Sequence, residues 1–280
     1  MFQSARGRKA PAQRSVRGLL DILEVLAEAG DGLALTEIAG RVKLAKSATH
    51  RLLTTLCERG LAIQDEATQH YRLTMLLAAL GFRFLAETGI TEICQPVLDR
   101  LAAETGELAR MAIVEPPRMT WTAKAQGARS GLRYDPDMGR EVILHATATG
   151  KAWLATLPER EALALVRKRG YGTPARFGPR AVRNEAELKR ELAETRRRGY
   201  GVALEEGEPG TAAIACVIRA SLAPNAPVVA TVSIAGPVVR LTPARRGALS
   251  RAVFAAAREL SSLWPIRRHL EASGRLARSA

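Results

Sequence analysis

The spacing of apolar residues changes at Gly60, and this change constrains the fold of the first 75 residues more than any other feature. Before Gly60, apolar residues recur at helical spacing in three segments that short turns separate. After it come two short strand-like runs, 61–64 and 70–73, which enclose the polar loop 65–69. Three helices followed by a hairpin predict a winged helix-turn-helix domain over residues 15–73.

Local signals place the ends of these three helices. Ser15 is the expected N-cap of the first helix, which ends near Gly30, and Thr36 is the expected cap of the second. The third helix is expected over about 46–59, where glycine follows its last residue.

The third helix carries a polar, cationic face near its N-terminus. With 100° per residue and Leu52 as the inward direction, the inward arc holds Ala45, Ala48, Thr49, Leu52, Leu53, Thr55 and Leu56. The outward arc holds Lys46, Ser47, His50, Arg51 and Thr54. Hydroxyls, N–H groups and cations suit phosphates and base edges, so this face is expected to bind DNA; an ordinary solvated face is the alternative. The expected DNA-binding residues are these five together with Thr36 and, from the hairpin, Gln69 and Arg72.

The remaining chain divides into four further segments. Residues 1–14 are expected to form a disordered basic arm, and 266–280 a basic tail. Segment 74–90 reads as a linker helix between domains or subunits, because it has little polar face. Segment 91–265 alternates helices and strands, which predicts a mixed α+β domain. The strands are expected at 107–114, 118–125, 212–219 and 228–235, and the helices at 91–105, 148–156, 159–168, 184–198 and 243–262.

Charge favours a polyanionic partner without locating it. Lys and Arg number 42 against 28 Asp and Glu, a net charge of +14, but most of the excess lies in 163–200 and 240–280. The three cysteines form no CxxC pair and no metal-ligand spacing, so no metal site is expected. With no long apolar run and no apolar core in the first 17 residues, a cytoplasmic protein is expected.

Catalytic motifs are absent from the sequence. It contains no GxSxG, no HExxH, no P-loop and no GxGxxG that opens a helix after a strand. His145 and Cys216 have no supporting spacing, and Glu205, Glu206 and Glu208 are expected in a solvated loop. Neither a catalytic residue nor a cofactor is therefore expected.

Four segments of the chain resemble IclR-type bacterial transcriptional regulators. Residues 15–73 resemble the family's DNA-binding domain. The segments LHATATGKAWLATL at 144–157, LAETRRRGYGVALEEGEPG at 192–210 and VSIAGPVVRLTP at 232–243 are similar to hallmark segments of its effector-binding domain, in the same order. The resemblance implies a winged helix-turn-helix domain, a linker helix and a GAF-like domain whose antiparallel sheet is flanked by helices. It also implies dimers or tetramers on palindromic operators, and a small-molecule effector.

The expected effector pocket combines a helix start with an apolar wall. Residues 147–150 (Thr147, Ala148, Thr149 and Gly150) offer N–H groups to a carboxylate, although a plain helix cap is the alternative. The resemblance places further pocket positions at Ala203, Thr211, Ala213, Ser233 and Ala235. Three of these are alanines where relatives that bind very small oxo-acids carry polar groups, so a bulkier acid, such as an aromatic one, is expected. Trp121 and Tyr134 are expected to add surface or to pack in the core.

We therefore expect a DNA-binding transcriptional regulator, a repressor of a catabolic operon, whose operator affinity responds to a small organic acid. Two alternatives remain open. One is an architectural DNA-binding protein whose second domain only oligomerises, and the other is an enzyme with an accessory DNA-binding domain.

Overall fold

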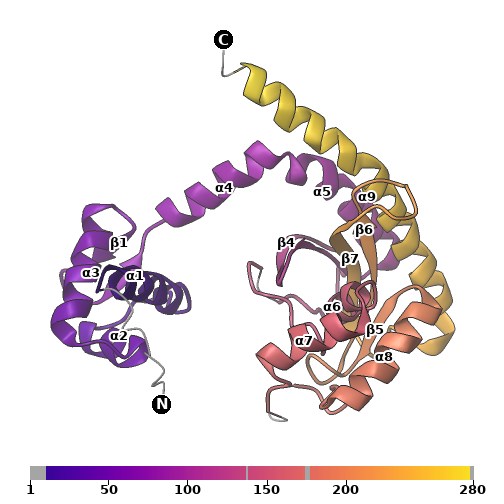
Figure 1. The fold of residues 1–280 in the computed structure, drawn as a ribbon, viewed down its shortest axis with the longest axis horizontal. Coiled ribbons are helices and arrows are strands. Elements are labelled where there is room, and N and C mark those ends of the chain that lie inside the picture. The colour runs from indigo at the N-terminus through magenta and orange to yellow at the C-terminus, as the bar shows by residue number, and fades with distance from the viewer. Residues whose placement is uncertain (1–10, 137, 174–176, 278–280) are drawn as a thin grey trace, which may run out of the picture. The chain divides into compact units, whose positions relative to one another are not determined.

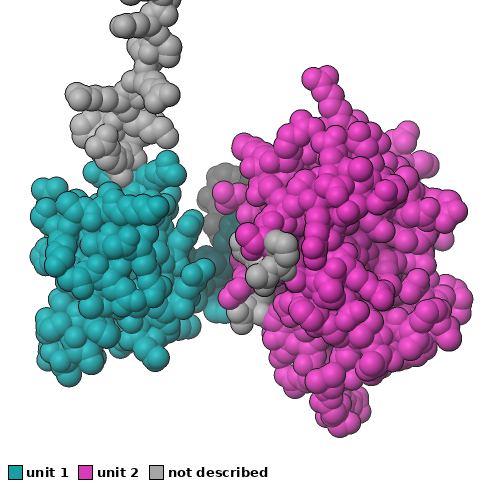
Figure 2. Space-filling model, turned by 90° about the horizontal axis from the view of Figure 1, so that it is seen from below, with its two compact units in different colours: residues 1–85 teal, residues 86–280 magenta. Residues whose placement is uncertain are grey.

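The computed structural model describes residues 11–136, 138–173 and 177–277, and the chain divides into two compact units after Leu85 (Figures 1 and 2). None of the helices within those ranges is long and apolar enough to cross a membrane. Each unit has its own core, as expected for a chain of this length.

The first unit is the winged helix-turn-helix that the sequence predicts. Its elements are α1 (Pro11–Ala27), α2 (Leu35–Val42), α3 (Lys46–Glu58), β1 (Ala62–Gln64) and β2 (Tyr71–Leu73). The two strands pair antiparallel and form a hairpin. Ile22, Ile38, Leu53 and Leu56 pack into one core, because the three helices each turn one apolar stripe inward.

Both predicted helix caps in this unit are wrong. Helix α1 begins at Pro11, so it includes Ser15 and also residues 11–14, which were expected in the disordered arm. Residues 1–10 of that arm lie outside the described residues. Helix α2 begins after Ala34, and Thr36 lies in its first turn. The reason is a backbone bridge: Leu33 exchanges two hydrogen bonds with Tyr71, which keeps the chain extended as far as Ala34.

The second unit is an α+β domain built on one antiparallel sheet, as predicted. The strand order is β4-β3-β7-β6-β5. The strands are β3 (Leu108–Glu115), β4 (Arg118–Gln126), β5 (Gly201–Leu204), β6 (Thr211–Arg219) and β7 (Val228–Pro237). The helices are α5 (Ile90–Thr105), α6 (Ala148–Leu154), α7 (Glu159–Arg169), α8 (Glu185–Arg198) and α9 (Pro243–Ala277). Helix α4 (Leu76–Thr88) spans the division between the units.

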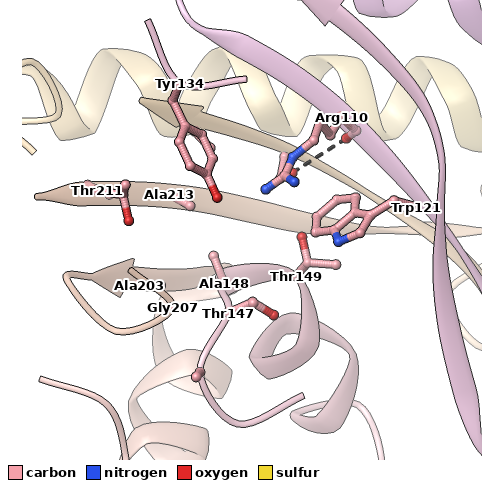
Figure 3. A pocket seen from close by; sticks show the side chains of 14 residues that line it. Arg110, Trp121, Tyr134, Thr147, Ala148, Thr149, Ala203, Gly207, Thr211 and Ala213 are labelled. Carbon is pink, nitrogen blue, oxygen red and sulfur yellow. Dashed lines mark hydrogen bonds between the residues drawn. The ribbon is translucent and has the colours of Figure 1, made fainter. Parts of the chain in front are cut away.

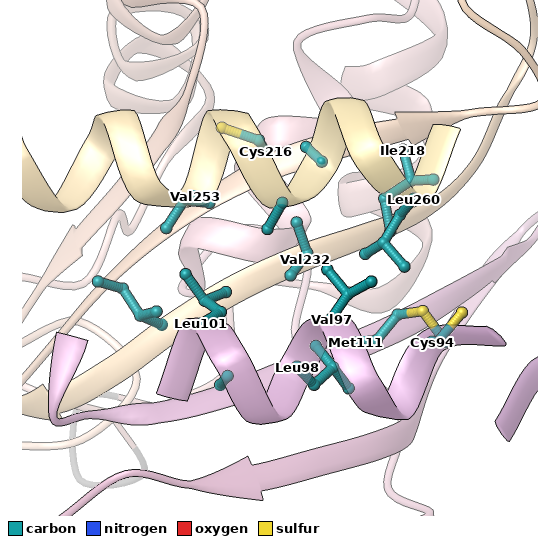
Figure 4. Packing of buried hydrophobic residues seen from close by; sticks show 14 of the residues in the cluster. Cys94, Val97, Leu98, Leu101, Met111, Cys216, Ile218, Val232, Val253 and Leu260 are labelled. Atoms are coloured by element: carbon teal, nitrogen blue, oxygen red, sulfur yellow. The ribbon is translucent and has the colours of Figure 1, made fainter. Parts of the chain in front are cut away.

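Alternating side chains give the sheet two different faces. On β6, Ile214, Cys216 and Ile218 point into a core that α5 and α9 cover (Figure 4). The residues that alternate with them, Ala213, Ala215 and Val217, belong to a smaller cluster with α6 on the opposite face. The helix-covered face closes the main core, and the small residues of the other face leave room beside α6.

Two elements of this unit differ from the prediction. Strand β5 was not expected, since it has only four residues at the edge of the sheet. Helix α9 continues to Ala277, so most of the segment expected as a separate basic tail extends this helix. Proline is unfavourable inside a helix, so the sequence predicted that this helix ends before Pro265.

Candidate DNA-binding surface and ligand pocket

The outward face of α3 presents the polar and cationic residues expected of it. Lys46, Ser47, His50, Arg51 and Thr54 are all exposed. The buried residues of the helix are Thr49, Leu53 and Leu56. The centre of the buried stripe is therefore not Leu52, which is only half-buried. Ala45 and Thr55 were expected to face inward, but both are exposed.

The N-terminus of α3 has no side-chain cap. Its N-cap is Ala45, whose carbonyl oxygen accepts the N–H groups of Ala48 and Thr49 at 3.0 and 2.9 Å. Among the described residues, no side chain accepts the N–H groups of Lys46 and Ser47. Unpaired N–H groups at a helix start suit an anion such as a DNA phosphate.

The hairpin holds its own turn with polar side chains. The Asp65 carboxylate accepts the Thr68 N–H at 2.8 Å, and this hydrogen bond lowers the pKa of Asp65. Gln69 adopts a positive φ of 60°, donates to the Glu66 carbonyl at 2.8 Å and accepts from Gln64 at 3.1 Å. Gln69 thus supports the turn, whereas Arg72 is exposed on β2.

The structure gathers the expected effector residues, with the exception of Gly150, around one pocket in the second unit (Figure 3). About 390 Å³ between the protein atoms, part of it open to solvent, lies within this pocket. Its expected members are Trp121, Tyr134, Thr147, Ala148, Thr149, Ala203, Thr211, Ala213, Ser233 and Ala235. Arg110, Ala146, Gly207 and Ala212 also line it, and sequence reasoning missed them.

Gly150 serves the packing of α6. A side chain there would place its Cβ 2.4 Å from the Cα and carbonyl oxygen of Leu144. Its N–H donates to the Thr147 hydroxyl at 3.0 Å, and that hydroxyl donates to the Ile143 carbonyl at 2.8 Å. The helix start is therefore capped by its own threonine, as in the alternative that the sequence left open.

Arg110 is the charged residue of the pocket. It lies on β3 among apolar neighbours and is 7% exposed. Its guanidinium carbon lies 3.8 Å from the ring centroid of Trp121 and 5.5 Å from that of Tyr134. Burial lowers the pKa of the guanidinium, and Tyr134 and Glu208 oppose that shift. An arginine inside the otherwise apolar run 108–114 was the available sequence signal.

A buried ion pair fixes the loop that carries Gly207. The Lys151 ammonium is completely buried and contacts both oxygens of Glu206 at 2.7 and 2.8 Å. It also contacts Glu191 at 3.1 Å. Glu206 is buried, so its expected place in a solvated loop is wrong. Burial raises the pKa of Glu206, and Lys151 opposes that shift.

Cys216 is no nucleophile in this arrangement. It lies in the core under α5 and α9, and burial raises the pKa of its thiol to about 12. His145 packs elsewhere, edge-on to Tyr171 and Phe177. In the part of the chain that the structure describes, no three His, Cys, Asp or Glu side chains are grouped as metal ligands would be.

Comparison with known proteins identifies the family. Residues 15–66 match the IclR helix-turn-helix domain, and residues 82–262 match the C-terminal domain of the bacterial transcriptional regulator IclR. The HTH-type transcriptional regulator BhcR of Paracoccus denitrificans is 36% identical over 248 residues, which cover 89% of this chain and 86% of the relative. The transcriptional repressor IclR of Escherichia coli is 32% identical over 266 residues, which cover 91% and 94%.

A solved structure shares the fold of both units. It is an IclR homologue from Microbacterium hydrocarbonoxydans in complex with 4-hydroxybenzoate, with a TM-score of 0.69 and 21% identity over 88% of this chain and 97% of that one. Together with the two family domains in order along the sequence, these matches show that the chain is a DNA-binding transcriptional regulator of the IclR family.

Proposed function

We propose that this protein is a repressor of a catabolic operon, that it works in the cytoplasm, and that a small organic acid in the pocket of the second unit changes its affinity for operator DNA. The observation that carries the proposal is a pocket in the unit without the helix-turn-helix, lined by alanines and one buried cation. Such a lining suits a ligand with an apolar body and an anionic group.

Helix α3 is the proposed recognition helix. Ser47, Arg51 and Thr54 are exposed where a major groove could receive them, and the two uncapped N–H groups of the first turn suit a phosphate. Lys46 and His50 add cationic or polar contacts beside them, while Thr36 on α2 and Arg72 on β2 are proposed to contact the DNA backbone.

Helix α4 is the proposed contact between two copies. The exposed apolar residues of this helix include Leu77 at 38%, Leu80 at 43% and Phe84 at 66%. These three residues follow a spacing of three and four, which forms a single apolar stripe. A second copy would cover that stripe, and two-fold symmetry then calls for a palindromic operator.

The proposed ligand is an acid with an aromatic or similarly bulky body. Ala148, Ala203 and Ala213 supply small apolar wall positions, and Trp121 and Tyr134 supply rings. The 4-hydroxybenzoate bound to the crystallised homologue supports this choice, because that protein shares the fold.

A binding-site selection from random DNA, followed by titrations of the enriched site, tests the proposal. We expect enriched sites with two-fold symmetry, and a change of about 5- to 150-fold in DNA affinity when an aromatic acid saturates the pocket. Arg51→Ala should weaken binding to the enriched site, because Arg51 lies on the proposed recognition face. Arg59→Ala is its matched control, since Arg59 is an exposed arginine at the C-cap of the same helix. If symmetric sites are enriched but no organic compound changes the affinity for them, an architectural DNA-binding protein is the better interpretation.

A further inference from the structure

Arg110 is a buried cation that forms no ion pair with the described residues; the hydroxyl of Tyr134 and the more distant Glu208 offset its charge only in part. No carboxylate lies within 4.0 Å of its guanidinium among them, and its buried Nε has no hydrogen-bond partner. The other buried ionic side chains described in this unit, Lys151, Glu206 and Glu107, all have partners. Lys151 contacts Glu206 and Glu191, and Glu107 contacts Arg240. Since an unpaired buried charge is costly, such a group is expected where an anion binds.

The rings around Arg110 orient its remaining donors toward the pocket. Trp121 lies 3.8 Å from the guanidinium carbon and Tyr134 lies on the other side at 5.5 Å. Figure 3 shows the guanidinium pointing between these two rings toward the space above Ala148 and Thr149. A guanidinium held in this way keeps a planar edge of N–H donors, which matches the two oxygens of a carboxylate.

The nearest acid that could compete for this edge is Glu208. It is exposed, and it accepts a long hydrogen bond of 3.4 Å from the Tyr134 hydroxyl. Glu208 therefore lies near the Arg110 charge without an ion pair to it, and it leaves the buried edge of the guanidinium to a ligand.

The start of α6 is a weaker place for an anion than the sequence indicates. The Gly150 N–H is used by Thr147, and Gly150 does not line the pocket. Arg110 is the only cationic side chain among the described residues that line it. One cation at one end and alanines at the other favour a ligand with a single carboxylate.

We propose that Arg110 binds the carboxylate of the effector through its planar edge and thereby restricts the effector to monocarboxylic acids, with the apolar body of the acid against Ala148, Ala203 and Ala213. This inference rests on the proposed function, because it names the residue and the ligand class of the same pocket. Arg110 is a specificity-determining residue in this account, and neutral analogues of the same shape bind more weakly because they leave its charge unpaired.

Calorimetry on the full-length protein tests the inference with benzoate and 4-hydroxybenzoate, each paired with its neutral amide. We expect at least one acid to bind and its amide to bind about 10- to 100-fold more weakly, since a charge-assisted contact is lost. Arg110→Met keeps an unbranched apolar stem and removes the guanidinium with its charge, so we expect a similar loss for the acid and none for the amide. Lys124→Met is the matched control. Lys124 lies opposite Arg110 in the register of β3 and β4 but does not line the pocket, so its substitution should leave the affinity unchanged.

Several results would overturn the inference. Equal affinity for acid and amide would do so, as would unchanged acid binding in folded Arg110→Met. If that variant does not fold, the comparison of acid and amide on the wild type decides alone. Failure of both acids to bind the wild type also rejects the inference. The proposed function fails separately, when no compound of any charge changes the affinity for selected DNA.

Discussion

Replacing Lys151 with methionine tests whether the buried ion pair holds the pocket loop. The ammonium is fully buried and contacts three carboxylate oxygens at 2.7, 2.8 and 3.1 Å. In Lys151→Met, the Glu206 side chain, only 9% exposed, keeps one N–H donor, Leu204 at 3.3 Å. Breaking a buried pair in this way costs about 3–5 kcal/mol. With a urea m-value of about 2–3 kcal/mol/M, the unfolding midpoint should fall by roughly 1–2.5 M.

Tryptophan fluorescence measures this change in the second unit alone. The three tryptophans, Trp121, Trp153 and Trp264, all lie in residues 86–280, so unfolding of the first unit does not contribute to their signal. Lys189→Met is the control, because Lys189 is 44% exposed and its ion pairs are 3.4 and 3.6 Å long. We expect it to cost about 0–1 kcal/mol.

The pH dependence of Lys151→Met has a definite sign. Without the lysine, burial is the main influence on Glu206 and raises its folded pKa above the unfolded value. Such a group loses stability as the pH rises through the unfolded pKa, so the deficit should be smaller at pH 5 than at pH 8. Adding Glu206→Gln should recover part of the stability. A loss no larger than that of Lys189→Met, or a deficit that grows at pH 5, would refute this account of the pair.

Four further outcomes are expected. Arg51→Ala and Ser47→Ala should weaken DNA binding without lowering the melting temperature of the protein; if Arg51 reads a base edge, the loss is about 1–3 kcal/mol, whereas unchanged affinity in both variants would mean that another face binds DNA. Ala213→Leu should fill the pocket and abolish binding of an aromatic acid in calorimetry while DNA affinity stays unchanged, and retained acid binding would place the ligand elsewhere. Leu80→Arg should convert a dimer to a monomer in light scattering, because the described residues leave that stripe exposed and a second copy is proposed to bury it; a wild-type monomer rejects the dimer. Gly150→Ala should lower the melting temperature, since its Cβ would meet the Leu144 backbone at 2.4 Å, and an unchanged value would contradict that clash.

Periodicity predicted the first unit well because its three helices each bury one stripe. The outward residues of α3 follow directly from such spacing. The cap expected at Thr36 is wrong because the start of α2 depends on the Leu33–Tyr71 bridge, whose second residue is distant in sequence. The cap expected at Ser15 is wrong because α1 begins earlier, at Pro11. A strand as short as β5 offers too few residues to show alternation.

The pocket was only partly accessible from the sequence. The family resemblance supplied Ala203, Ala213, Ala235 and Ser233, because those positions belong to recognisable segments. Arg110 lies in an ordinary apolar strand, and its burial against Trp121 depends on the pairing of β3 with β4. Of the three acids Glu205, Glu206 and Glu208, the one that is buried is the one that meets Lys151. Lys151 is distant in the sequence, so no local pattern predicts this contact.

The dissociation constant of the wild-type protein for a selected DNA site, with and without a saturating aromatic carboxylate, tests the central claim most directly. Fluorescence anisotropy of labelled DNA gives both values at one salt concentration, and calorimetry on the same sample establishes that the acid is bound. The account predicts a change of about 5- to 150-fold, which corresponds to a coupling of about 1–3 kcal/mol between pocket and DNA. The same dissociation constant with the acid demonstrably bound would contradict it.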